Sequence, residues 1–173
     1  DGKMLAVTEE EPEADRVIDA AGKVVAPGFI DIHMHEDPVK DDKIQFCIFD
    51  AMLRMGVTTA VGGNCGINVY DPVKYLDLLE RDGAPVNVMM FAGHQYYREA
   101  AGALDKYSPV TEEQRKMMKK GLEEALEAGC VGISYGLRYV PGTGREEFLD
   151  TASCCQKEHR LISAHVRDDE ERV

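Results

Sequence analysis

The sequence predicts an α/β fold whose parallel sheet forms part of a (β/α) barrel. Two observations predict this class. From residue 28 onward, short apolar runs alternate with segments of helical periodicity, which is the pattern of strands joined by right-handed crossover helices. The second and third of these runs are nearly continuous in apolar residues, as expected for parallel strands buried on both faces.

The elements follow one another with short connections, and capping residues set their limits. Asp71 is the expected N-cap of one helix with Pro72 at its first position, and Thr111 with Gln114 fits a capping box. In chain order, the predicted elements are strand 28–33, helix 44–55, strand 57–61, helix 72–81, strand 86–91, helix 112–128, strand 130–134, helix 145–158 and strand 161–164.

Five strands fit either an open doubly wound sheet or part of an eight-stranded barrel. The potentially reactive side chains favour the barrel, because they fall at or just after strand carboxyl ends, where barrel active sites are built. Open sheets also bind ligands at this edge. These side chains are His33, His35, Cys65, His94, Tyr139 and His165. We therefore predict the first five strands of a TIM-like (β/α) barrel over residues 28–173.

Residues 1–27 differ from the rest of the chain. Residues 5–7 and 17–25 are typical of short antiparallel strands, and Ala21-Gly22 is suited to a hairpin turn between them.

Composition limits the functions that need to be considered. A net charge of −12 argues against nucleic acid or anionic lipid as the main partner. No apolar run approaches the length of a membrane span. The cysteines are odd in number and lack paired spacing, which favours reduced thiols and a cytoplasmic location over a disulfide framework. They are Cys47, Cys65, Cys130, Cys154 and Cys155.

The first predicted strand ends in a His-x-His pair, His33 and His35, and Asp37 follows two residues later. Side chains alternate between the faces of a strand, so all three would point the same way if the strand continued that far. Two imidazoles on one face can bind one divalent metal ion, and such a site is typical of hydrolases. The alternative is a strand that merely ends in polar residues.

Cys65 lies in the turn Gly62-Gly-Asn-Cys-Gly66, directly after the second strand. The glycines allow a tight turn and close approach to a ligand, and a thiolate there could bind zinc or bridge two metals. A small buried hydrophobic side chain is the alternative, and we expect that role for the other four cysteines.

Four further side chains follow later strands. His165 ends the fifth strand, where it faces the same opening as His33 and His35, although it could be a hydrogen-bonded surface residue. Arg167 is suited to clamp a carboxylate, with an ion pair to the acidic run 168–171 as the alternative. Tyr139 could donate to a developing oxyanion or pack against its loop. His94 could orient substrate, but a structural role is favoured.

Taken together, these segments resemble the N-acyl-D-amino-acid deacylase (D-aminoacylase) branch of the amidohydrolase superfamily. The His-x-His strand indicates only the superfamily, whereas the Gly-Asn-Cys-Gly turn points to this branch. The matching segments are 25–37, 56–66, Gly93-His-x-x-x-Arg98, 132–142 and Ala164-His-Val-Arg167.

The resemblance implies a metal-bearing barrel beside a small β-sandwich formed by both chain ends, with residues 1–27 as its first part. It implies that Cys65 and His165 bind a tightly held zinc ion and that His33 and His35 belong to a weaker metal position. Tyr139 would help to polarise the scissile carbonyl, and Arg167 would lie near the substrate carboxylate.

The implied reaction is hydrolysis of an N-acyl-D-amino acid, a small-molecule substrate, to a carboxylate and a free D-amino acid. A further zinc-binding histidine and a general-base aspartate would come from later strands, so the chain is interpreted as an N-terminal fragment. One alternative is a cyclic-amide hydrolase of the dihydropyrimidinase or dihydroorotase type, in which a carboxylated lysine often bridges the metals. Strands two to four contain no lysine, which favours the deacylase. The other alternative is a non-catalytic metal-binding protein.

Overall fold

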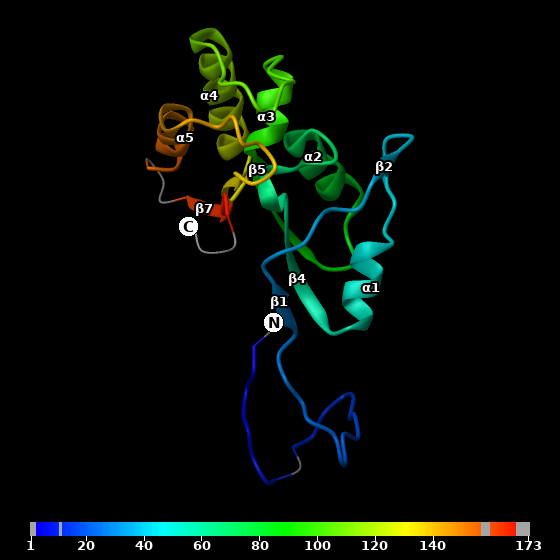
Figure 1. Cartoon of the computed structure of the whole chain (residues 1–173). Helices are drawn as coiled ribbons and strands as arrows, with labels where there is room; N and C mark the ends of the chain where they lie inside the picture. Colours follow the sequence, from blue (N-terminus) through cyan, green and yellow to red (C-terminus); the bar gives the residue numbers. More distant parts are fainter. Residues whose placement is uncertain (1–2, 11, 157–159, 169–173) are drawn as a thin grey trace.

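Five parallel strands form a curved sheet, in which the spatial order β1-β4-β5-β6-β7 is also the order along the chain. The computed structural model describes residues 3–10, 12–156 and 160–168. The strands are β1 (Phe29–Asp31), β4 (Val57–Gly62), β5 (Asn87–Gly93), β6 (Gly132–Gly136) and β7 (Leu161–His165). This arrangement confirms the predicted partial (β/α) barrel (Figure 1).

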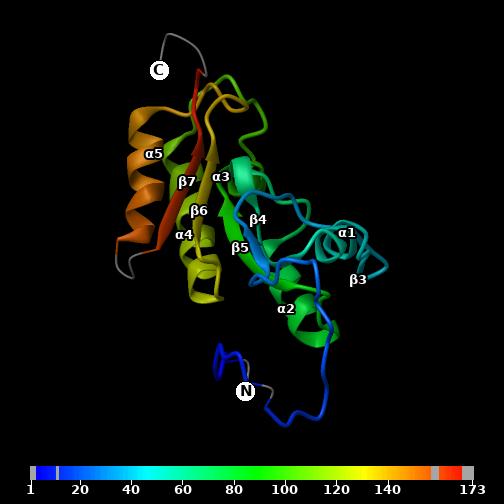
Figure 2. The same ribbon diagram turned by 90° about the horizontal axis from the view of Figure 1, so that it is seen from below.

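Helices connect the strands and cover one side of the sheet, and Figure 2 shows α4 and α5 side by side along β6 and β7. The core between helices and sheet contains the fully buried side chains of Met90, Met118, Leu122 and Ile133. The helices are α1 (Ile48–Arg54), α2 (Pro72–Asp82), α3 (His94–Ala100), α4 (Glu112–Glu127) and α5 (Arg145–Ala152), with short 3-10 turns η1 (Asn64–Gly66) and η2 (Ser153–Cys155).

Both predicted helix starts with capping residues are confirmed. The Asp71 carboxylate accepts from the Lys74 backbone N–H at 3.0 Å at the start of α2. At the start of α4, the Thr111 hydroxyl accepts from the Gln114 N–H at 3.2 Å, and the Gln114 side chain accepts from the Thr111 N–H at 2.9 Å.

The first helix begins later than predicted. Ile44 belongs to a short hairpin of β2 (Val39–Lys40) and β3 (Lys43–Ile44), and only from Ile48 is the chain helical. The reason lies in Asp37, whose carboxylate accepts from the backbone N–H groups of Ile48 and Phe49 at 2.7 and 2.9 Å and so fixes the helix start.

Two other elements differ from prediction. The segment after β5, which was not predicted to be helical, forms α3. The predicted helix 145–158 ends at Ala152 and continues as η2, while its last two residues lie outside the described residues.

The segment before β1 extends away from the sheet (Figure 1). The expected turn is present, because the Lys23 N–H donates to the Ala20 carbonyl at 2.9 Å. The expected antiparallel strands are absent from the described residues 3–10 and 12–28, since no ladder partner pairs with them there. Assignment of residues 1–27 to a separate β domain stays a prediction.

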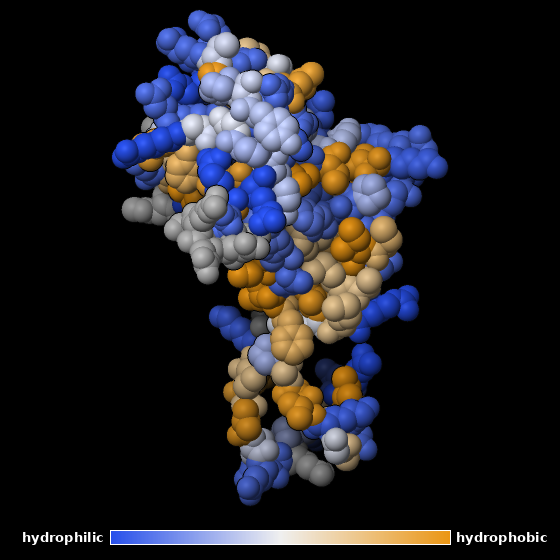
Figure 3. Space-filling view, viewed as in Figure 1, coloured by the Kyte–Doolittle hydropathy of each residue, from blue (hydrophilic) through white to orange (hydrophobic). Residues whose placement is uncertain are grey.

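Apolar side chains remain exposed around β1, where Figure 3 shows them gathered beside the N-terminal segment. They include Phe29, Ile30, Ile32 and Met55. Within the described ranges, β1 and β7 each pair with one strand only, so both are sheet edges. The longest described helix, α4, has 16 residues, and none of the described helices combines the length and apolarity that a bilayer crossing demands.

Candidate metal centre

Three side chains predicted as metal ligands lie together at the carboxyl end of the sheet. The ligand atoms of His33, His35 and Cys65 all lie within 4.8 Å of one another. The Cys65 Sγ is 3.4 Å from His33 Nε2 and 3.7 Å from His165 Nδ1. The thiol therefore has an imidazole nitrogen from the segment after β1 on one side and one from β7 on the other.

The fold brings these side chains together through the η1 turn. In a flat sheet, β1 and β7 would be separated by four spacings of about 4.8 Å each. The turn that carries Cys65 crosses this distance at the end of the sheet: Ser134 on β6 accepts from the Gly66 N–H at 3.0 Å, and Ser163 on β7 donates to Asn64 Oδ1 at 3.3 Å. Cys65 can therefore contact ligands from both edges.

Cys65 has a left-handed backbone conformation, with φ of +59°, which is unusual for a residue other than glycine. Its neighbours explain how the turn is tolerated. A Cβ atom at Gly63 would lie 2.3 Å from the Phe91 carbonyl oxygen, and one at Gly66 would lie 2.8 Å from the Gly136 nitrogen. Only glycine fits at these two positions, and a strained cysteine held between them is typical of a functional site.

The set of donors fits a zinc ion. Imidazole nitrogen and thiolate sulfur are the ligands that zinc prefers in proteins. Burial raises the pKa of the Cys65 thiol, so the metal-free thiol holds its proton at neutral pH. Metal binding at this cysteine would then release that proton.

Asp37 does not join the cluster, because β1 ends at Asp31 and the alternation of strand faces does not reach it. Its buried carboxylate caps α1 and also accepts from the Cys47 thiol at 2.9 Å. All five cysteines are free, as expected from their spacing. Cys130, Cys154 and Cys155 are buried as predicted, whereas the same prediction is wrong for Cys47, which is exposed at the start of α1.

Tyr139 lies beside the histidine of β7. Its hydroxyl is 3.1 Å from His165 Nδ1, the two ring centroids are 4.8 Å apart, and the side chain is 40% exposed. Arg167 holds the same loop from the other side, since its two terminal nitrogens donate to the carbonyls of Pro141 and Thr143 at 2.7 and 2.8 Å. In this structure the Arg167 guanidinium thus anchors the loop of Tyr139.

Comparison with known proteins places this arrangement in a family. The sequence model of the amidohydrolase family (Amidohydro_3) matches residues 16–138. The chain belongs to the amidohydrolase family. An N-acyl-D-glutamate deacylase of Alcaligenes xylosoxydans xylosoxydans is 34% identical to the present chain, in a match that covers 92% of this chain and 37% of the deacylase. A D-aminoacylase of the same organism is 32% identical over 90% of the chain and 37% of its own length.

Solved structures show the same similarity. An N-acyl-D-glutamate deacylase from Bordetella bronchiseptica, complexed with zinc and a phosphonate inhibitor that mimics the tetrahedral intermediate, superposes with a TM-score of 0.73 and 32% identity. The match covers 87% of the present chain and 36% of the Bordetella enzyme. A D-aminoacylase with a binuclear metal centre superposes with a TM-score of 0.78 and 29% identity. The match covers 91% of the present chain and 38% of the D-aminoacylase. The chain thus spans a little over a third of the relatives that it matches.

His94 is not among the clustered candidate metal ligands. It is completely buried, and its Nε2 is 2.9 Å from the Glu147 carboxylate, which also accepts from Arg98 Nε at 3.1 Å. The terminal nitrogens of Arg98 donate hydrogen bonds to the backbone carbonyls of Asp105 and Ser108. This buried charge cluster gives His94 a structural position, which is the role that the sequence favours.

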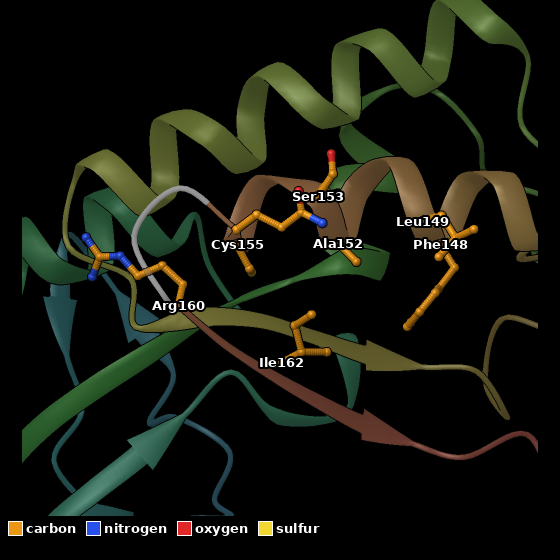
Figure 4. A pocket seen from close by; sticks show the side chains of 8 residues that line it. Phe148, Leu149, Ala152, Ser153, Cys155, Arg160 and Ile162 are labelled. Carbon is orange, nitrogen blue, oxygen red and sulfur yellow. The ribbon is translucent and has the colours of Figure 1, made fainter.

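A depression of the amidohydrolase surface lies between α5 and β7 (Figure 4). Its lining is largely apolar and includes Phe148, Leu149, Ala152 and Ile162, with Arg160 at one end. None of the candidate metal ligands lines it.

Sequence reasoning missed the residues that hold the cysteine turn. Asn64 donates to the carbonyls of Ile32 and Val61 at 3.2 and 2.9 Å, and Ser134 bonds to both Gly63 and Gly66. Asn64 stands next to Cys65 in the singled-out motif, which is a signal for its role. Nothing in the local sequence around Ser134 indicates its contact with a turn 68 residues away.

Proposed function

We propose that the whole protein containing this chain is a zinc-dependent hydrolase that cleaves the amide bond of N-acyl-D-amino acids, giving a carboxylate and a free D-amino acid. The observation that carries the proposal is the position of the Cys65 thiol between imidazoles of His33 and His165. The similarity to an N-acyl-D-glutamate deacylase and a D-aminoacylase supports the substrate class.

His33, His35, Cys65 and His165 would hold the metal. Zinc bound there would supply a Lewis acid for the amide carbonyl and lower the pKa of a bound water. The left-handed turn places the Cys65 Sγ within 4.8 Å of the ligand atoms of His33 and His35. Tyr139 would donate a hydrogen bond to the oxygen on which negative charge develops.

The proposal is tested by incubating the purified whole protein with N-acetyl-D-amino acids, their L isomers and dihydropyrimidine-type cyclic amides. Release of free amino acid from the D isomers alone is the expected result. Turnover of the cyclic amides instead would favour the cyclic-amide hydrolase, for which no carboxylated lysine is available on β4, β5 or β6. Zinc binding with no turnover of any of these would favour a non-catalytic metal-binding protein.

Replacement of Tyr139 by phenylalanine is expected to lower kcat for the D substrate on the order of a hundredfold, with a much smaller change in KM, because a donor to the developing oxyanion is lost. The matched control is Tyr107→Phe, since Tyr107 is 68% exposed and its ring lies against the Lys106 ammonium, 5.3 Å from the ring centroid. Equal kcat values in the two variants would show that Tyr139 has no role in the reaction.

A further inference from the structure

Glu36 connects the histidine segment to the cysteine turn. It follows His35 directly in sequence, yet its side chain is only 3% exposed and its carboxylate points toward the turn after β4. Oε2 accepts from the Gly63 N–H at 3.1 Å, and Oε1 accepts from the Val69 N–H at 3.3 Å. The two ends of the loop around Cys65 are therefore bonded to one carboxylate.

A third bond ties this carboxylate to the centre of the sheet. Asn68 Nδ2 donates to Glu36 Oε1 at 2.9 Å and to the Phe91 carbonyl at 3.2 Å, while Asn68 Oδ1 accepts from the Gly93 N–H at 2.7 Å. Glu36 and Asn68 together fix the loop 63–69 against the end of β5. A charged acceptor that receives several N–H groups holds its donors more strongly than a neutral acceptor does.

We infer that Glu36 is a positioning residue that sets the left-handed Cys65 turn in register with His33 and His35, so that thiol and imidazoles can bind one metal ion together. This inference rests on the proposed metal centre. Glu36 is itself engaged by three N–H donors, and it acts through Cys65 rather than as a ligand. Residues that orient metal ligands in this way typically change metal affinity about 10–100-fold when replaced.

The adjacent Asp37 provides a matched control. Its carboxylate is also fully buried and also accepts from three backbone N–H groups, those of Cys47, Ile48 and Phe49. Those bonds cap α1 and do not contact the Cys65 turn. Glu36→Gln and Asp37→Asn thus remove one buried negative charge each, from neighbouring positions, with different structural targets.

The experiment measures zinc affinity of the whole protein by competition with a chromophoric chelator, together with the thermal unfolding midpoint of the metal-free form. It also records the thiolate-to-cobalt charge-transfer absorption of the Co²⁺-substituted protein. We expect Glu36→Gln to weaken zinc binding by about 10–100-fold and to lower the cobalt–thiolate absorption. We expect Asp37→Asn to lower the unfolding midpoint of the metal-free protein about as much as Glu36→Gln does. Its zinc affinity should change less than about threefold.

Equal zinc affinities in Glu36→Gln and wild type would overturn the inference, and so would equal losses in the two variants. If Glu36→Gln does not fold, Glu36→Asp is used, which keeps the charge but shortens the side chain, and the same comparison applies. Failure of the proposed metal centre looks different, because the wild-type protein would then bind no zinc at all, and failure of the proposed reaction would appear as zinc binding without release of a D-amino acid.

Discussion

Replacement of Cys65 by alanine is expected to abolish zinc retention by the whole protein and to lower deacylase activity by a factor on the order of a thousand or more. The thiol is the only group placed against the imidazoles of both His33 and His165 among the described residues, so its loss removes a ligand from either metal position. Elemental analysis after dialysis and initial rates with an N-acetyl-D-amino acid measure the two effects.

Cys130→Ala is the matched control for this variant. Cys130 is a free cysteine that is completely buried in the hydrophobic core, and its thiol is not part of the cluster of candidate ligands. This variant should lose some stability, since a core thiol is removed, but it should keep its zinc. Full zinc occupancy and normal turnover in Cys65→Ala would overturn the assignment.

Replacement of Glu147 by alanine is expected to lower the free energy of unfolding by about 3–5 kcal/mol, because it leaves the buried Arg98 guanidinium without its counter-charge and the buried His94 ring without its hydrogen-bond partner. The Glu147 side chain is 3% exposed and pairs with His94 and Arg98. Its neighbour Glu146, whose side chain is 89% exposed, pairs with Arg115 at 3.2 Å. Glu146→Ala should therefore cost at most about 1 kcal/mol.

The stabilisation that Glu147 provides is expected to depend on pH. Burial by itself raises the pKa of Glu147, but the hydrogen bond and charge of His94 and the charge of Arg98 more than offset this, so the pKa lies below its ordinary value of 4.5. A carboxyl group with a lowered folded-state pKa stabilises the fold fully above the unfolded value, and this stabilisation is lost as the pH falls through the folded value. Urea unfolding at pH 7 and at about pH 3 should show a smaller difference between wild type and Glu147→Ala at the lower pH. A difference independent of pH would mean that Glu147 contributes by packing alone.

Much of the fold could be predicted because its signals are local. The apolar runs of β4 and β5 mark buried parallel strands, and Asp71 and Thr111 mark helix starts through bonds to residues three positions away. The β2–β3 hairpin was not predictable in this way, since strands of two residues are too short to show a periodicity. The delayed start of α1 depends on Asp37, eleven residues before Ile48.

The candidate site was predictable to the extent that its residue types are distinctive at strand ends. His33, His35 and Cys65 stand out because histidine pairs and a cysteine among glycines are suited to metal binding, and the parallel sheet predicts that such strand ends meet. The residues that hold the Cys65 turn in place could not be identified from the sequence. Glu36 and Ser134 act on a turn that is 27 and 68 residues away, and only the folded chain reveals these contacts.

The metal dependence of hydrolysis tests the central claim most directly. The whole protein is assayed for D-amino acid release as isolated, after removal of metal by a chelator, and after stepwise return of Zn²⁺, with bound zinc quantified at each step. The account predicts activity that is lost with the metal, returns in proportion to the first zinc bound, and does not return in Cys65→Ala. D-amino acid release that persists without bound metal would contradict it.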